Sequence, residues 1–136
     1  EAYRVLRPGG RLIIADFFKM KDLNPHESDQ VKKWAACWAI NDFSTKEDFD
    51  NKLNQNCFHD IVWQNATDAI MPSAKKLYRS YFLGIIGAKF YQFFNSHATE
   101  LGKNSVQSAY LQYQTLKRGL WKYQIVKAVK DPGEHQ

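Results

Sequence analysis

Cysteine and long apolar runs are both scarce in this sequence, and each scarcity excludes a class of protein. The two cysteines, Cys37 and Cys57, form no CxxC or His-Cys pattern. A disulfide or zinc framework is therefore not indicated, and a reducing cytoplasm is the simplest location. The most apolar stretch, Tyr81 to Phe94, contains Lys89 and two glycines. A transmembrane helix needs a longer uncharged run, so none is predicted.

Two further features are missing, a secretory start and a dense basic block. The chain opens Glu-Ala-Tyr-Arg, without an initiator Met or a basic start followed by an apolar segment. It therefore resembles a piece of a longer protein. The net charge of +5 would suit nucleic acid, but the basic residues are spread along the chain and never form a block of five. We interpret them as a solvated surface and expect no nucleic-acid partner.

What is present fits one globular domain. The chain has 136 residues, 44% of them hydrophobic and 15% aromatic, which is enough to bury a modest core. Pro8-Gly9-Gly10 ends a first helix, and the apolar run Arg11 to Phe18 is typical of a strand covered on both faces. The spacing of apolar residues predicts helices over 1–7, 26–40, 44–56, 71–94 and 104–120, and strands over 11–18, 59–64 and 121–130.

Three turns refine these predictions. Ser44 and Glu47 have the spacing of a capping box at the start of a short helix, with Phe49 and Leu53 facing inward. Pro72 is expected in the first turn of the long helix, where its missing N–H is harmless. Gly119 ends the last helix before the final strand.

Arg4-Val5-Leu6-Arg7-Pro8-Gly9-Gly10-Arg11-Leu12-Ile13-Ile14-Ala15-Asp16 resembles the segment that leads into the fifth strand of class I S-adenosylmethionine-dependent methyltransferases. The stretch from Glu47 to Ile61 resembles the helix and turn before the sixth strand, with Asn56 and Cys57 where the family usually has Ala-Gly. Asn56 could adopt the left-handed conformation there, whereas a cysteine is less suited to it. Trp121 to Lys130 resembles the antiparallel seventh strand.

The resemblance implies an α/β fold: the C-terminal half of a Rossmann-like seven-stranded methyltransferase sheet, holding strands five, seven and six in that order. Residues 1–66 and 120–130 would form the sheet core with flanking helices. Residues 67–119 would be a helical insertion that covers substrate or forms an association face. Such insertions are similar to those of the small-molecule branch, which includes the methyltransferase type 11 and ubiquinone-biosynthesis-like enzymes.

The cofactor of that family is S-adenosylmethionine, and the chain lacks the residues that would hold it. No Gly-x-Gly-x-Gly turn follows a strand, and no acidic residue is placed to bind the ribose hydroxyls. Gly9-Gly10 precedes a strand, and Gly84-x-x-Gly87 lies within a predicted helix. We therefore expect the cofactor to be bound by an N-terminal half upstream of Glu1, and the fragment to be inactive alone.

Candidate substrate contacts follow from the same frame, because ligands of open α/β sheets lie beyond the carboxyl ends of the strands. Asp16, Phe17 and Phe18 end the first strand, although Asp16 could simply cap the next loop and the phenylalanines could be core. Trp34 and Trp38, four residues apart, either wall the pocket or pack on the sheet, and packing is favoured. In the insertion, apolar residues form a substrate lid, an association face or a buried helix: Tyr78, Tyr81, Phe82, Ile85, Ile86, Phe90 and Phe94.

No side chain stands out as a catalyst or metal ligand. His26, His59 and His97 are isolated in the sequence, without carboxylates at useful spacing, and no metal-binding set is present. Two functions of different class remain open: the substrate-side half of a methyltransferase that acts on a small, possibly lipophilic molecule, or a non-catalytic interaction module derived from one. An unpaired edge on the first strand would favour self-association as a homodimer, through that edge or the insertion helix.

Overall fold

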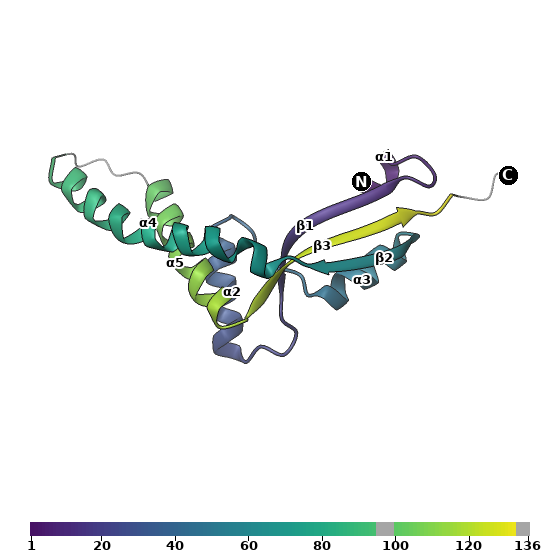
Figure 1. The fold of residues 1–136 in the computed structure, drawn as a ribbon, viewed down its shortest axis with the longest axis horizontal. Coiled ribbons are helices and arrows are strands. Elements are labelled where there is room, and N and C mark those ends of the chain that lie inside the picture. Colours follow the sequence, from purple (N-terminus) through teal and green to yellow (C-terminus); the bar gives the residue numbers. More distant parts are fainter. Residues whose placement is uncertain (95–99, 133–136) are drawn as a thin grey trace.

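The chain, described by a computed structural model over residues 1–94 and 100–132, folds as a small sheet flanked by helices, with two of them extending beyond it as an arm (Figure 1). No helix in the described ranges is both long and apolar enough to cross a bilayer. The elements in chain order are α1 (Ala2–Val5), β1 (Arg11–Lys19), α2 (Pro25–Ala36), α3 (Lys46–Gln55), β2 (Phe58–Asn65), α4 (Thr67–Phe94), α5 (Glu100–Lys117) and β3 (Trp121–Lys130).

The last strand lies in the middle of the sheet. The strand order is β1-β3-β2, and β3 is antiparallel to both neighbours, with Val126 opposite Ile14 on one side and Trp63 on the other. Since both outer strands run against β3, they run parallel to each other, and their carboxyl ends lie at the same end of the sheet. A central, antiparallel last strand is the local arrangement that the sequence resemblance predicts.

The two edges of the sheet differ. The β2 ladder shifts register between His59 and Val62, and Asp60 adopts a left-handed φ of 50° there, so this edge is bulged. The β1 ladder is regular from Arg11 to Lys19. Among the described residues, the outer edge of β1 is bridged only at its end, between Lys19 and Thr45.

One face of the sheet is covered along its length. Phe58, Val126 and Ala128 are buried there with Leu53 of α3, and residues from α1, α3, β1 and β2 pack around them. The partly buried members of this cluster, which we call the α3 cluster, are Tyr3, Leu6, Leu12, Ile14, Phe49, Ile61 and Trp63. The predicted inward positions of Phe49 and Leu53 are confirmed.

The opposite face is covered only at the carboxyl end of β1, where α2, α4 and α5 gather. Trp34 of α2 stacks on Trp121 of β3 with ring centroids 4.6 Å apart, and both are fully buried. Around them lie the other buried members of what we call the junction cluster: Val31, Ala35, Phe43, Ala74, Leu116 and Leu120. Away from the junction this face is open, with Ile13 60% and Val62 59% exposed.

Two helix starts differ from the sequence predictions. The N-cap of α3 is Thr45, whose hydroxyl accepts from the Asp48 amide at 3.1 Å, so the predicted Ser44–Glu47 capping box is wrong by one residue. Ser44 is instead engaged through its carbonyl, which accepts from the Lys19 amide at the end of β1. The helix α4 begins at Thr67, which places Pro72 inside it rather than in its first turn.

Two turns also differ. Cys57, not Asn56, takes the left-handed φ of 56° before β2, although its Cβ makes that conformation unfavourable. The helix α2 ends at Ala36, earlier than predicted, and Ala39 has a φ of 57°. The chain therefore turns away after Cys37, so Trp34 and Trp38 do not share a helix face, and Trp38 is 55% exposed.

Candidate functional site

A cavity of about 230 Å³ lies where β1 and β3 meet the arm. Phe17 from β1 and Tyr123 from β3 are opposite each other in the ladder and form its floor on the sheet side. Leu77 is 46% exposed, so the cavity opens to solvent beside it. The helices contribute the remaining lining residues: Ile70, Ser73, Ala74 and Leu77 from α4 and Gln112 from α5.

Aromatic packing fixes the Phe17 ring. Its centroid lies 5.0 Å from that of Trp34, 5.1 Å from Trp121 and 5.3 Å from Tyr123. Aromatic pairs of this kind, two of them edge-on and the Tyr123 pair tilted, add roughly 0.5–1.5 kcal/mol each beyond burial. Phe17 is therefore a rigid part of the cavity floor and also part of the junction cluster.

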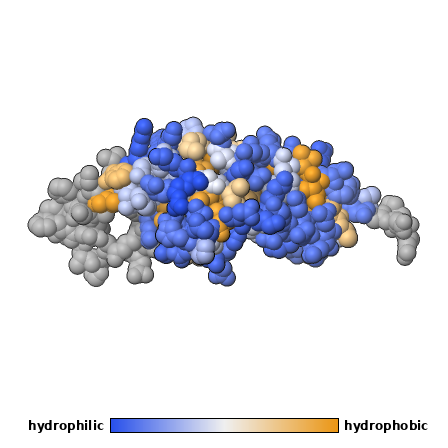
Figure 2. Space-filling model, turned by 90° about the horizontal axis from the view of Figure 1, so that it is seen from below, coloured by the Kyte–Doolittle hydropathy of each residue, from blue (hydrophilic) through white to orange (hydrophobic). Residues whose placement is uncertain are grey.

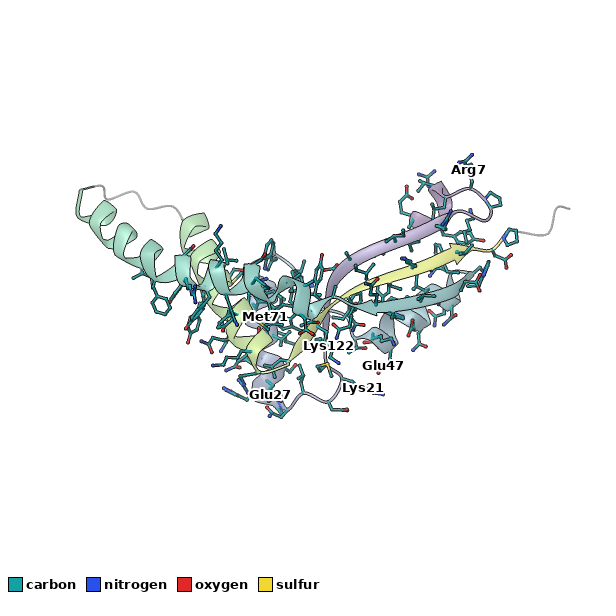
Figure 3. The ribbon with its side chains drawn as sticks, in the orientation of Figure 1. Arg7, Lys21, Glu27, Glu47, Met71 and Lys122 are labelled. Carbon is teal, nitrogen blue, oxygen red and sulfur yellow. The ribbon has the colours of Figure 1, made fainter. Side chains whose placement is uncertain are left out.

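The arm is hydrogen-bonded to the sheet at the base of α4. The Thr67 hydroxyl accepts from the Tyr123 amide at 3.1 Å, and the Ala66 amide donates to the Tyr123 carbonyl at 2.9 Å. In Figure 3, Met71 marks the base of α4 close to the junction, and Lys122 marks the start of β3. These bonds fix the cavity wall relative to its floor.

The second helix of the arm is held at its own end. The indole N–H of Trp121 donates to the buried Thr115 hydroxyl at 2.8 Å, and the Thr115 hydroxyl donates to the Leu111 carbonyl at 2.7 Å. Gly119, with a φ of 71°, lets the chain turn from α5 into β3 within three residues. Arg118 reaches across to Glu27 of α2 at 3.1 Å. Both helices that wall the cavity are thus anchored to β3 or α2.

The lining has no charged side chain. Ser73 and Gln112 are its polar aliphatic members, and the others are aliphatic or aromatic. An uncharged, mostly apolar cavity favours an apolar ligand oriented by a few hydrogen bonds. The described lining contains no carboxylate or imidazole to act as a general base.

Asp16, Phe17 and Phe18 were predicted to contact a ligand at the end of β1, and only Phe17 lines the cavity. Side chains alternate along a strand, so Asp16 and Phe18 point to the opposite face. Phe18 is buried against Phe49 and Trp63. Asp16 is exposed, and its carboxylate accepts from the Phe17 amide at 2.7 Å.

The predicted aromatic residues of the insertion gather on the arm, beyond the cavity. Tyr78 contacts Tyr81 and Phe82 within α4, and Tyr110 and Tyr113 across on α5. Ile85 is half-buried on the same helix. The side chains of Ile86, Phe90 and Phe94 lie outside the described set.

Several lining residues had a sequence signal that the predictions did not use. Tyr123 alternates with Trp121 and Ile125 on a predicted strand, so its shared face with Phe17 could have been deduced from an antiparallel pairing. Ile70, Ala74 and Leu77 follow helical spacing from Thr67, a start that was placed four residues too late. Gln112 carried no signal, because a polar residue in a helix is ordinarily solvated.

A second, more polar groove of about 550 Å³ lies between α3 and β2, where residues 58–61 and Trp63 line it. The indole N–H of Trp63 donates to Asp50 at 2.6 Å, and Lys46 lies over the Trp63 ring, 5.4 Å from its centroid. His59 has a carboxylate partner after all, since its Nδ1 lies 3.1 Å from Asp60, but both side chains are largely exposed. The groove lies toward the amino end of β2, away from the strand ends where α/β folds bind ligands.

Other reactive groups are not arranged for chemistry. Both cysteines are free. Burial raises the pKa of the Cys37 thiol, which donates to the Lys33 carbonyl, so it is a poor nucleophile. His26 lies next to Gln30, and His97 falls outside the described residues. In residues 1–94 and 100–132, no cluster of His, Cys, Asp and Glu could hold a metal.

The described residues do not fit S-adenosylmethionine. The glycines with positive φ, Gly9 and Gly119, both lie in turns that precede a strand. A cofactor loop needs such glycines after a strand, where the backbone approaches the ligand. The cavity lining also has no carboxylate for the ribose hydroxyls.

The fold is similar to part of three solved methyltransferase structures. A phosphoethanolamine N-methyltransferase from Haemonchus contortus, solved with phosphomonomethylethanolamine and S-adenosylhomocysteine, matches at a TM-score of 0.62 and 17% identity. The same enzyme with S-adenosyl-L-methionine matches at 0.55 and 18% identity. A protein from Galdieria sulphuraria assigned as a sarcosine dimethylglycine methyltransferase matches at 0.67 and 11% identity.

Each of these matches covers 96% of this chain, but the chain spans only 28% of the Haemonchus contortus enzyme and 45% of the Galdieria sulphuraria protein. At these identities the likeness shows the fold alone. No family model and no curated protein matches the sequence.

Proposed function

We propose that this chain forms the substrate-side part of an S-adenosylmethionine-dependent methyltransferase that acts on a small, apolar molecule. The observation that carries the proposal is the uncharged cavity between Phe17 and α4, at the carboxyl end of β1. In open α/β folds, ligands gather at this end of the sheet. The three strands then correspond to strands five, seven and six of the larger sheet, and residues 67–119 to an insertion that covers substrate.

Methyl transfer makes modest demands on such a site. The sulfonium methyl of the cofactor is already electrophilic, so holding the acceptor atom in line with it supplies much of the rate. Phe17, Tyr123 and Leu77 would exclude water and fix the plane of an apolar substrate, while Ser73 and Gln112 would orient its polar end. In this proposal Trp34 packs against Phe17 without lining the cavity, and Asp16 and Phe18 lie on the opposite face of the sheet.

The cofactor is proposed to be held outside this chain, by residues of the kind that its longer structural neighbours contain. Calorimetric titration of the chain with S-adenosylmethionine and S-adenosylhomocysteine is expected to give no binding heat. Saturable binding of either ligand would overturn this placement, because the described residues would then have to form a complete cofactor pocket.

The cavity itself is tested with 1-naphthol as an uncharged apolar probe, followed by fluorescence. Leu77→Trp places a larger side chain beside the cavity opening and is expected to weaken probe binding by about tenfold. Val62→Trp is the matched control, because Val62 is also exposed but lies on the open sheet face. Equal affinity in the wild type and Leu77→Trp would contradict the proposal.

A non-catalytic interaction module is the second candidate, favoured by the apolar residues on the open face of the sheet. Ile13 and Val62 are exposed there, and the edge of β1 is regular. Exposed apolar patches and free strand edges are typical association sites. The chain alone is then expected to form a homodimer, and a strictly monomeric species in light scattering at tens of micromolar would count against it.

A further inference from the structure

Charge is divided unequally along the chain. Residues 1–68 contain nine basic and eleven acidic residues, whereas residues 69–130 contain ten basic residues and a single acid, Glu100. The second segment includes both helices of the arm except the first two residues of α4, one of which is Asp68. The overall charge of +5 therefore conceals an excess of eight positive charges over residues 67–130, which contain the arm and the strand that follows it. Such asymmetry is typical of a surface that meets an anionic partner.

On α4 these charges lie next to apolar side chains. Lys75, Arg79 and Phe82 follow each other at intervals of four and three residues, which places them along one side of the helix. Lys75, Lys76 and Arg79 are exposed, and Phe82 is 49% exposed. No Asp or Glu occurs between Asp68 and Glu100 to neutralise them.

The exposed Phe82 packs against two tyrosines of the same helix. Its ring meets those of Tyr78 and Tyr81, each with centroids 5.2 Å apart, and Tyr78 packs at 4.6 Å on Tyr113 of α5. The Gln114 amide donates to the Tyr78 hydroxyl at 3.1 Å. Tyrosines pair an apolar ring with a polar tip and are enriched where a protein meets the headgroup layer of a bilayer. Figure 2 shows hydrophobic atoms at the surface on this part of the molecule.

We propose that the arm formed by α4 and α5 binds the surface of an anionic lipid bilayer, with Lys75, Lys76 and Arg79 at the headgroups and Phe82 inserted between them. Lys and Arg side chains at the headgroups, together with an apolar side chain such as Phe that inserts among them, are features of helices that lie in the interface. Nucleic acid would satisfy the same charges, but it would not favour an exposed Phe82 and Leu77 on the same helix. The apolar sequence from Tyr81 to Phe94 also favours lipid.

The test is vesicle flotation of the full chain, comparing pure phosphatidylcholine with phosphatidylcholine containing about 30% phosphatidylserine, in roughly 0.1 M salt. The chain is expected to float with the anionic vesicles and to be released as salt rises. Lys75→Gln/Lys76→Gln/Arg79→Gln is expected to lower the partition coefficient by at least about tenfold, because three basic residues that attract the anionic headgroups are lost together.

The matched control is Arg7→Gln/Lys21→Gln/Lys52→Gln, which removes the same net charge from exposed positions away from the arm. Figure 3 shows Arg7 at the far end of the sheet and Lys21 in a loop below it. This variant is expected to bind within about twofold of the wild type. Equal losses in the two triple variants would overturn the proposal, since net charge alone would then explain binding.

Phe82→Ser tests the insertion of the aromatic ring into the bilayer separately from the electrostatic attraction of the basic residues to the headgroups. It is expected to weaken vesicle binding with the salt dependence unchanged, whereas Val62→Ser, an exposed apolar position on the sheet, leaves binding intact. Absence of flotation with anionic vesicles would overturn the proposal. So would retention of a single-stranded RNA homopolymer that anionic vesicles fail to displace, which would identify nucleic acid as the partner.

Discussion

The two faces of the sheet contain similar residues and have very different surroundings. On one face, Leu12 and Ile14 pack with Val126 against α1 and α3. On the other face, Ile13 and Ala15 of the same strand are exposed, and helices cover only the end at Phe17. A strand that is apolar on both faces is built to be covered on both. In this chain one face is covered along its length, whereas helices cover the other face only at the carboxyl end of β1.

The α3 cluster and the proposed substrate cavity lie on different faces of the sheet. The covered face depends on ordinary side-chain burial around Leu53, whereas the junction on the other face adds directional bonds and a cavity. The uncovered part of the second face, around Ile13 and Val62, buries little apolar surface and contributes little to the free energy of unfolding of the chain alone. Substitutions on the two faces should therefore have unequal effects.

The largest expected difference is between Leu53→Ala and Ile13→Ala. Leu53 is buried in the α3 cluster, so its truncation should lower the free energy of unfolding by about 2–5 kcal/mol. Ile13 is exposed, and its truncation should change it by about 0.5 kcal/mol or less. Urea denaturation followed by circular dichroism measures both, and equal losses would show that the open face is covered in solution.

A smaller effect is expected at the junction. Thr115→Val keeps the shape of the side chain but leaves the buried Trp121 N–H without its acceptor. The free energy of unfolding should fall by about 1–3 kcal/mol. Thr115→Ser keeps the hydroxyl and serves as the control in the same urea titration. Thr115→Val as stable as Thr115→Ser would mean that packing alone, without this bond, holds α5 on β3.

The smallest effect on stability, and the sharpest on association, is expected from Ile13→Asp. A charge at this exposed position should leave the unfolding free energy within about 0.5 kcal/mol and abolish self-association. Light scattering at matched concentrations measures the change, with Lys21→Asp, a charge change in a loop, as the control. A dimer that survives in Ile13→Asp would exclude the open face as its interface.

The elements of this fold could largely be predicted from the sequence, because apolar spacing and the Pro8-Gly9-Gly10 turn are local signals. The final strand has the predicted bounds, and its antiparallel central position follows from the family resemblance. The errors are at positions where tertiary contacts outweigh local preference. Ser44 is used by the end of β1, so Thr45 caps α3, and Cys57 accepts a left-handed conformation.

The site was harder to predict than the fold. Asp16, Phe17 and Phe18 were predicted together from their place at the end of a strand, and only Phe17 lines the cavity, because strand alternation sends the other two to the opposite face. Trp38 was paired with Trp34 on the assumption that α2 continues beyond Ala36. The cavity is made mainly by α4, whose register on the sheet depends on Thr67 and Tyr123, residues far apart in the sequence.

The bulge in β2 makes the two edges of the sheet unequal as sites where a further strand could pair. The left-handed Asp60 and the shifted register disrupt the pairing groups on that side, whereas β1 keeps a regular ladder on the other. An additional strand would therefore pair more readily with β1 than with β2. Pairing between two copies would consume both available edges and stop there, giving a closed pair in place of an open-ended filament.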